Sequence, residues 1–162
     1  MAEPRADRPD MPEGYLGPAP LPWAWAAEQL IDARSYWVTT IGPAGRPHVR
    51  PVWGVWLDDA VQFSTGSRQT ANITRDPRVT VNVESADECV IVEGSARASR
   101  DEDLRRAFIA AYEPKYEWPM TMDFVDVVYV VKPRIVLGWI AADIATQATL
   151  FQATATRWRF DD

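Results

Sequence analysis

The chain has few of the residues that bind metals or form covalent links. Its 162 residues include one cysteine, Cys89, and one histidine, His48. A disulfide within the chain is therefore impossible, and a metal site made of cysteine and histidine ligands is almost excluded, so we expect no metal. A serine or cysteine nucleophile would have to use His48, and no Gly-x-Ser-x-Gly motif accompanies it.

Long apolar runs, an excess of positive charge and nucleotide-binding motifs are also missing. The apolar residues, 47% of the chain, fall in short runs, which predicts no membrane span. A net charge of −6 argues against a nucleic-acid partner. There is no Gly-x-Gly-x-x-Gly and no Walker loop. Residues 1–10 are charged and proline-rich, unlike a secretory signal. We therefore expect a cytoplasmic protein.

Prolines, by contrast, are concentrated at the start of the chain. Six of the 13 prolines lie in the first 22 residues. Proline donates no backbone hydrogen bond, so this stretch is neither a helix nor a central strand. We predict two parts, a proline-rich N-terminal arm over residues 1–22 and one domain over 23–162.

The apolar pattern of that domain predicts a mainly β fold. Helical spacing is found over 23–34 and over 101–112, where residues 99–102 have the form of a capping box. The expected strands, several of which alternate apolar and polar residues, cover 35–41, 47–57, 61–65, 79–84, 89–98, 124–131, 134–140 and 153–160, with Pro133 separating two of them. This number of short strands favours a small barrel over a sandwich.

One segment has the opposite charge to the rest of the chain. Residues 42–80 contain five arginines against three aspartates, a charge of +2, which suits a small anionic ligand. Within it, residues 64–72 supply hydroxyls where a strand passes into a helix, a common way to hold phosphate. The strand before them shows His48, Arg50, Val52, Gly54 and Trp56 on one face, an unusual mixture for a solvent face.

These motifs resemble a known family. The run Thr39–Trp53 (TTIGPAGRPHVRPVW) is similar to the second and third strands of the pyridoxamine 5′-phosphate oxidase-like split barrels. Phe63–Gly66 followed by Asn72–Val79 (NITRDPRV) resembles the motif that comes next in that family. The ending Ala155–Phe160 is similar to that of many members, and the branch of flavin/deazaflavin oxidoreductases is the most similar.

The resemblance implies a six-stranded split β-barrel (an FMN-binding split barrel) with a few peripheral helices. It also implies a homodimer with cofactor grooves between the subunits, which Trp139 or Trp158 of the second copy would close. The cofactor ring would lie along the strand at 50–54 and the phosphate at 64–72. The cofactor-binding residues implied are Arg50, Pro51, Val52, Trp53, Ser64, Thr65, Gly66, Ser67, Arg68, Gln69 and Asn72.

The activity implied is that of an oxidoreductase. A deazaflavin, F-420, would pass hydride to a small electron-poor organic substrate, and FMN is the alternative cofactor. A third hypothesis is a non-catalytic carrier of a cofactor or apolar ligand, including haem, for which His48 is the only imidazole. The catalytic residues are unknown, since Tyr36, His48 and solvent all remain open as the proton donor.

The sequence departs from the family pattern at two positions. Gln69 stands where the family usually has lysine, and Ala71 where it usually has arginine. The two missing cations are the argument for the carrier hypothesis. Arg50 and Arg68 are the residues we expect to replace them, because arginine is a good bidentate partner of phosphate.

Overall fold

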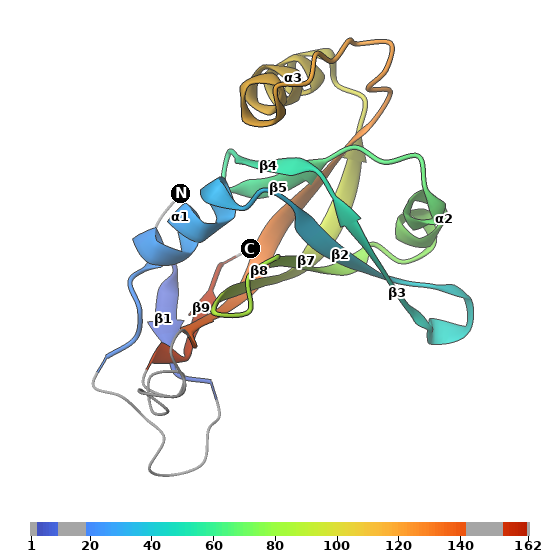
Figure 1. The fold of residues 1–162 in the computed structure, drawn as a ribbon. Helices are drawn as coiled ribbons and strands as arrows, with labels where there is room; N and C mark the ends of the chain where they lie inside the picture. Colours follow the sequence, from blue (N-terminus) through green and yellow to red (C-terminus); the bar gives the residue numbers. More distant parts are fainter. Residues whose placement is uncertain (1–2, 10–18, 142–153, 162) are drawn as a thin grey trace.

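The computed structural model describes residues 3–9, 19–141 and 154–161. These residues form one nine-stranded sheet, three α-helices and a short 3-10 helix at Pro43–Gly45 (Figure 1). The helices are α1 (Trp23–Asp32), α2 (Arg68–Arg75) and α3 (Glu102–Tyr116). The strands are β1 (Arg5–Asp7), β2 (Tyr36–Ile41), β3 (Pro47–Val52), β4 (Gly54–Leu57), β5 (Ala60–Phe63), β6 (Arg78–Val83), β7 (Glu88–Ser99), β8 (Val128–Ile140) and β9 (Thr156–Arg159).

The sheet is a split barrel, as the sequence predicts. Its hydrogen-bonded neighbours run in the order β4-β5-β8-β7-β6-β2-β3, so β4 and β3 are the two edges of this path. The ladder is not closed by hydrogen bonds between those edges. They are instead consecutive in the chain and joined by the single residue Trp53. The barrel is thus bridged by the chain itself.

The break at Trp53 replaces the single strand predicted over residues 47–57. Up to Val52 the chain pairs with β2, and from Gly54 it pairs with β5. Trp53 belongs to neither ladder. The change of partner depends on where other strands lie, which is why the alternating pattern did not reveal it.

A second correction concerns Pro133, which does not separate two strands. Residues 128–140 form one strand, β8, and Pro133 lies opposite Gly94 at an irregularity in the β7–β8 ladder. A bulge tolerates proline, because the ladder bond that proline cannot make is already interrupted there. On its other edge β8 pairs with β5 in its first half and with β9 in its second half.

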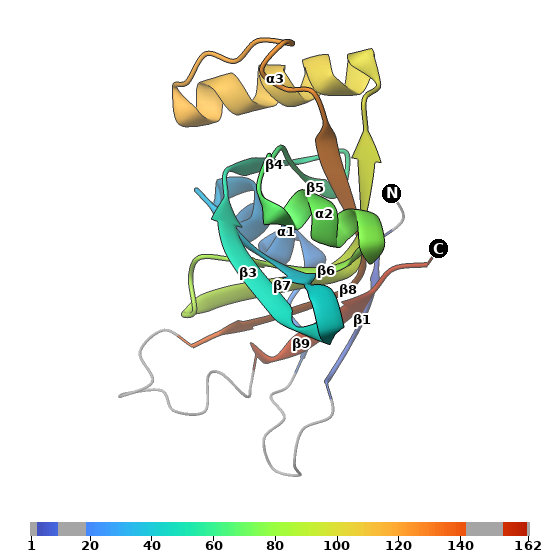
Figure 2. The same cartoon turned by 90° about the vertical axis from the view of Figure 1, so that its right-hand side faces the viewer.

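Two apolar clusters make up the core. The larger one fills the barrel and is covered by α1, with inward side chains such as Val79, Val81 and Val83 taken from the predicted alternation of β6. The smaller one lies between α3 and the β4, β5 and β8 strands. Figure 2 shows α3 lying across one end of the barrel and α2 beside β2 and β3.

Helix α3 differs from the prediction at both ends. Its N-cap is Asp101, whose carboxylate accepts a hydrogen bond from Leu104 N at 2.9 Å, so the predicted capping box at 99–102 is shifted. The helix continues past Pro114 to Tyr116. The aromatic side chains of Tyr112 and Tyr116 are buried there, and this packing offsets the hydrogen bond that Pro114 cannot donate.

Within the proline-rich arm, β1 pairs antiparallel with β9 at the edge of the sheet. The Asp7 carboxylate holds it there by accepting hydrogen bonds from Arg157 Nε at 2.7 Å and Arg159 Nε at 3.0 Å. Hydrogen bonding to Arg157 lowers the pKa of Asp7. The division between an arm and a domain at residue 22 stays a prediction.

Candidate functional site

The predicted cofactor-binding residues occupy two neighbouring stretches of the barrel. Arg50, Pro51 and Val52 end β3, Trp53 follows them, and residues 64–72 form the loop after β5 and the first half of α2. Figures 1 and 2 agree in placing α2 beside β2 and β3. The fold therefore brings the two sequence motifs to one side of the molecule.

The loop before α2 is held by its own hydroxyl groups. Ser67 is the N-cap of the helix, and its Oγ accepts a hydrogen bond from Gln69 N at 3.3 Å. Thr65 Oγ1 lies 3.0 Å from Ser67 Oγ, and Thr70 Oγ1 donates to Thr65 O at 3.1 Å. Gly66 between them is exposed and Ser64 is half-buried. The loop is therefore a fixed hydroxyl-rich turn at the positive end of a helix dipole.

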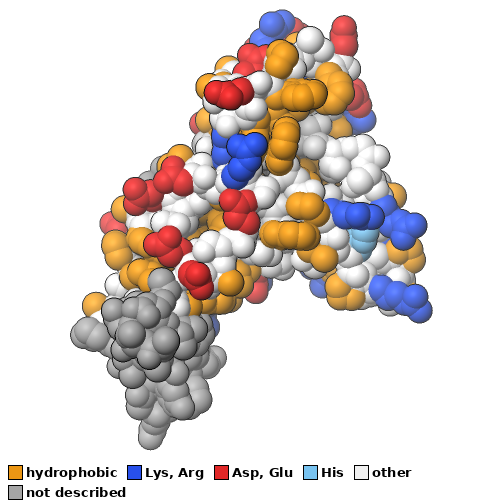
Figure 3. Space-filling view, in the orientation of Figure 1, with side chains coloured by type: hydrophobic (Ala, Val, Ile, Leu, Met, Phe, Trp, Pro, Cys, Tyr) orange, Lys and Arg blue, Asp and Glu red, His pale blue; other side chains and the backbone are white. Residues whose placement is uncertain are grey.

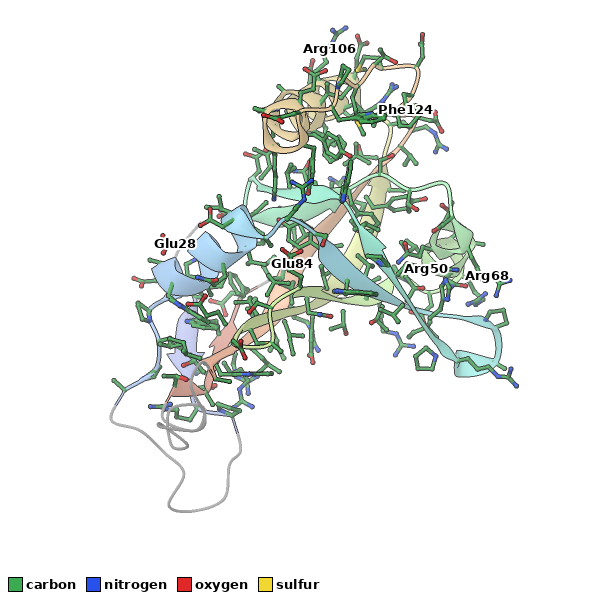
Figure 4. All side chains as sticks on the ribbon, viewed as in Figure 1. Glu28, Arg50, Arg68, Glu84, Arg106 and Phe124 are labelled. Atoms are coloured by element: carbon green, nitrogen blue, oxygen red, sulfur yellow. The ribbon has the colours of Figure 1, made fainter. Side chains whose placement is uncertain are left out.

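Two arginines border this turn and are free to meet an anion. Arg50 and Arg68 are exposed, and within the described ranges no hydrogen bond or ion pair holds either guanidinium. Figure 4 labels both, and in Figure 3 blue side chains gather beside the single pale blue histidine in the same region. We call Arg50, Thr65, Ser67 and Arg68 the anion side of the site.

Two of the other three arginines of the positive segment, Arg75 and Arg78, differ in this respect. Arg75 donates hydrogen bonds to Ile41 O and Asn72 Oδ1. Arg78 forms an ion pair with Asp76, at 2.6 Å between Nη2 and Oδ2. Hydrogen bonds from Arg78 lower the pKa of Asp76 to about 2. Ion pairing thus accounts for Arg78 and backbone contact for Arg75, which leaves Arg46, Arg50 and Arg68 available.

Gln69 and Asn72, two of the predicted cofactor-binding residues, turn toward the barrel. Both side chains are buried, at 0% and 1% exposure. Gln69 Nε2 donates to Val38 O at 3.0 Å, and Asn72 Nδ2 donates to Thr40 Oγ1 at 2.9 Å. The amides attach α2 to β2. The position where the family usually has lysine is therefore occupied here by a buried amide with a backbone partner.

His48 lies on the same face of β3 as Arg50, because side chains two apart on a strand share a face. It is half-buried, and its Nε2 atom is buried without a hydrogen-bond partner among the described residues. Since an unpaired buried nitrogen carries a desolvation cost, His48 stands out as a polar group beside the anion side.

Tyr36 was the other side chain left open as a proton donor. It is fully buried, and its hydroxyl donates to Leu30 O at 2.5 Å. Burial raises its pKa far above the ordinary range. Tyr36 therefore fastens the end of α1 to β2 and has no access to a ligand at the surface.

Trp53 forms the other half of the site. Its indole is 44% exposed and stacks on the ring of Tyr116, with centroids 4.9 Å apart and planes 7° from parallel. The Arg34 guanidinium carbon lies 5.9 Å from the Trp53 ring centroid. We call Trp53, Gly54 and Tyr116 the ring side.

Sequence reasoning missed Tyr116. Its signal was present, because Phe108, Tyr112 and Tyr116 recur every four residues and so share one face of a helix. Pro114 concealed the signal, since it suggested that the helix ended earlier.

The tryptophans that the resemblance assigns to the partner's pocket differ in access. Trp158 is fully buried and packs against Trp23 and Trp25, at centroid distances of 5.8 and 6.4 Å. Trp158 is therefore part of the core and cannot close a pocket on another copy. Trp139 is half-buried on β8.

A large groove lies on another part of the surface. It has a volume of about 1180 Å³. None of the predicted cofactor-binding residues lines it. Its lining includes Thr39 and Ile41 of β2, Thr80 of β6, Glu93 of β7 and Lys132 of β8. The groove follows the outer face of the sheet, whereas the anion side lies beside α2.

Within the described parts of the chain, no three potential ligands from histidine, cysteine, aspartate and glutamate gather as a metal would require. None of the helices described is both long and apolar enough to cross a membrane.

Comparisons with known proteins bear on the family and the fold. The family model described as pyridoxamine 5′-phosphate oxidase matches residues 25–159, most of the chain. No curated protein matches the sequence. A conserved hypothetical protein from Mycobacterium tuberculosis is similar in structure, with a TM-score of 0.67 and 22% identity over 84% of this chain and 93% of that one.

Two further solved structures carry functional descriptions. An F-420 reductase matches with a TM-score of 0.54 and 27% identity, over 78% of this chain and 98% of that one. A putative pyridoxamine 5′-phosphate oxidase from Listeria innocua matches with a TM-score of 0.57 and 16% identity, over 72% and 94% of the two chains. At 16% and 22% identity the likeness establishes the fold alone.

Proposed function

Because this chain belongs to the pyridoxamine 5′-phosphate oxidase family, we propose that it is an oxidoreductase that binds the deazaflavin F-420 and reduces a small electron-poor organic substrate. The observation that carries the proposal is that two features lie on one side of the barrel. One is the hydroxyl-rich turn before α2 with its unpaired arginines, and the other is the exposed indole of Trp53, which stacks on Tyr116. The similarity to an F-420 reductase, at 27% identity, supports the choice of deazaflavin over FMN.

The residues present fit a phosphorylated cofactor. Arg50 and Arg68 supply two guanidinium groups without another partner in the described ranges, and Ser67 and Thr65 supply hydroxyls at the start of α2. Each charged phosphate contact of this kind contributes about 1.5–3 kcal/mol. These two arginines replace the cations that are absent at Gln69 and Ala71.

The ring side would orient the flat part of the cofactor. Pro51 and Trp53 are exposed beside the break between β3 and β4, whereas Val52 is buried, so this stretch would offer the indole and backbone groups to a ring. When bound, the deazaflavin supplies the hydride, and the protein supplies position and electrostatics. With Tyr36 buried, His48 or solvent would provide the proton.

We further expect a homodimer with the site at its interface. Trp37 and Val49, on the outer face of β2 and β3, are 40% and 49% exposed, and Trp37 lies opposite Pro51 in the β2–β3 ladder. Such apolar exposure is typical of a surface that another chain covers. Light scattering that returned a monodisperse monomer would contradict a site between subunits.

The decisive experiment is a titration of the purified protein with F-420 and FMN side by side, followed by tryptophan fluorescence. Tight binding of F-420 with weak binding of FMN is expected. The reverse result would make the protein an FMN-binding oxidase or reductase.

Binding of neither would favour the carrier hypothesis, which the buried amide of Gln69 and the unpaired Nε2 of His48 support. A visible spectrum recorded with added haem tests that hypothesis directly.

A pair of variants tests the anion side. Arg68→Ala should weaken F-420 binding ten- to hundredfold, by the loss of one charge-assisted contact. Arg106→Ala is the matched control, because Arg106 is an exposed arginine of α3 at the far end of the molecule (Figure 4). Equal affinities in the two variants would remove Arg68 from the site.

A further inference from the structure

The last turn of α3 meets the chain at the break between β3 and β4. Tyr116 is 7% exposed, and its hydroxyl oxygen accepts a hydrogen bond from Gly54 N at 2.9 Å. The same hydroxyl lies 2.7 Å from both Gly54 O and Arg34 O, the two acceptors within reach of its single proton. One side chain thus joins the start of β4 to the segment that enters β2.

The break makes that hydroxyl important. Ladder pairing with β2 ends at Val52, and pairing with β5 begins at Gly54. Buried backbone groups that lack a partner are costly, so a change of ladder requires partners from elsewhere. Tyr116 provides them at Gly54, which is itself buried and has no space for a side chain, since a Cβ atom there would lie 2.6 Å from Gln62 O.

The ring of Tyr116 fixes the indole of Trp53. The two rings are stacked, and Tyr116 is in turn packed against Tyr112 at 4.4 Å and Tyr112 against Phe108 at 5.5 Å. Trp53 is therefore the exposed end of a row of aromatic rings whose other members are buried. An indole supported in this way keeps one orientation although it is 44% exposed.

Contacts made by neighbouring residues also hold Tyr116 in place. Lys115 Nζ donates to Ile31 O at 3.1 Å and lies 5.7 Å from the Tyr116 ring. The Glu84 carboxylate, labelled in Figure 4, accepts hydrogen bonds from Arg34 N and Ser35 N. The Arg34 carbonyl, one of the two acceptors of the Tyr116 hydroxyl, thus belongs to a segment that Glu84 holds in place.

We propose that Tyr116 is a positioning residue for the cofactor ring, which it serves by holding Trp53 and the Gly54 backbone in place. The inference rests on the proposed function and names a residue outside the set that the sequence predicts. None of the contacts described for Tyr116 involves a residue of the anion side, so its effect should be limited to the ring side.

The first test uses no cofactor. Tyr116→Phe retains the stacked ring and removes the hydroxyl, so hydrogen exchange at the Gly54 amide, followed by NMR, should be about tenfold faster. Tyr112→Phe is the matched control, because Tyr112 lies one turn earlier in the same aromatic row and none of the contacts described for Gly54 involves it. Unchanged exchange in Tyr116→Phe would overturn the inference.

The second test separates ring from phosphate. Tyr116→Phe should bind F-420 about tenfold more weakly than the wild type while binding inorganic phosphate equally well. A weakening of both ligands, or of neither, would overturn the positioning role. A wild type that binds neither F-420 nor FMN would overturn the proposed function itself and the inference with it, whereas a failure limited to the variant comparison overturns the inference alone.

A third variant keeps the inference testable if Tyr116→Phe does not fold. Trp53→Leu removes the exposed indole but leaves the hydroxyl and its partners untouched. It should weaken F-420 binding about tenfold without changing exchange at Gly54. Full retention of F-420 affinity in Trp53→Leu would contradict a ring held against this side chain.

Discussion

Arg50 and Arg68 reach solvent from β3 and from the start of α2, whereas Trp53 lies on a buried tyrosine that is hydrogen-bonded to backbone. The two halves of the site thus meet different demands. A phosphate attracts cations over several ångströms, and long flexible side chains can adjust to it. A flat ring makes weaker, short-range contacts, which are useful only where the surface is already fixed. Substitutions on the anion side should therefore change ligand affinity without changing the free energy of unfolding, whereas substitutions of the ring-side backbone should change both.

The largest effect is expected when both cations of the anion side are removed. Arg50→Ala combined with Arg68→Ala should reduce F-420 affinity by about 3–6 kcal/mol, since each charge-assisted contact contributes about 1.5–3 kcal/mol. The free energy of unfolding should change by less than about 0.5 kcal/mol, because both side chains are exposed and unpaired in the described structure. Fluorescence titration and urea denaturation measure the two quantities. A large loss of stability would contradict the separation.

On the ring side, Gly54→Ala should affect stability and ring binding together. The added Cβ would lie 2.6 Å from Gln62 O and 3.2 Å from Phe63 Cβ, so β4 or β5 must shift. Overpacking of this kind costs about 1–3 kcal/mol, which urea denaturation measures. Gly66→Ala is the control, because nothing lies within 4 Å of a Cβ built there. Equal stabilities in the two variants would show that the backbone between β3 and β4 accommodates the added methyl group without cost.

Within α2 the same difference should hold between two faces of one helix, because its buried amides bond to β2 and contribute to stability, whereas the anion side lies at its exposed start. Gln69→Leu fills a similar volume but leaves Val38 O without its partner. The cost should be about 1–2 kcal/mol of unfolding free energy. Thr74→Ala, on the exposed face of α2, should cost less than Gln69→Leu in the same urea titration. A neutral Gln69→Leu variant would mean that the amide is present for another reason, such as a ligand.

The smallest effect is expected far from the site, at Asp7. Its folded-state pKa is lowered, chiefly by the hydrogen bond from Arg157, so its contribution to stability is complete above the usual aspartate pKa of about 4. That contribution should decline as the pH falls from about 4 through the lowered pKa. The protection factor of the Ala6 amide against hydrogen exchange should fall over the same range, since Ala6 pairs with Trp158 in this ladder. Asp7→Asn should abolish this pH dependence, and its persistence would assign the effect to another group.

The sequence predicted those parts of the fold that depend on local pattern. Alternation located β6 and β7, and the resemblance located the split barrel and the two motifs that meet beside α2. The break at Trp53 was not visible, because it arises from a change of pairing partner that the alternating pattern does not encode.

Within the site, the sequence identified candidate residues but not the directions in which their side chains point. Gln69, Asn72 and Ile73 are spaced three and four apart, the spacing of one helix face, and all three are buried. That spacing could have separated them from Arg68. The hydroxyl of Tyr116 could not be placed, since its partners Gly54 and Arg34 lie 62 and 82 positions away in the chain.

The pairing of β1 with β9 has a consequence for the order of folding. Arg5 lies opposite Arg159, so this ladder closes almost the whole chain into a ring. Closing so long a loop is entropically costly until the barrel between the strands exists. β1 should therefore dock after the rate-limiting step of folding. Asp7→Ala should leave the refolding rate unchanged and accelerate unfolding, which stopped-flow tryptophan fluorescence resolves.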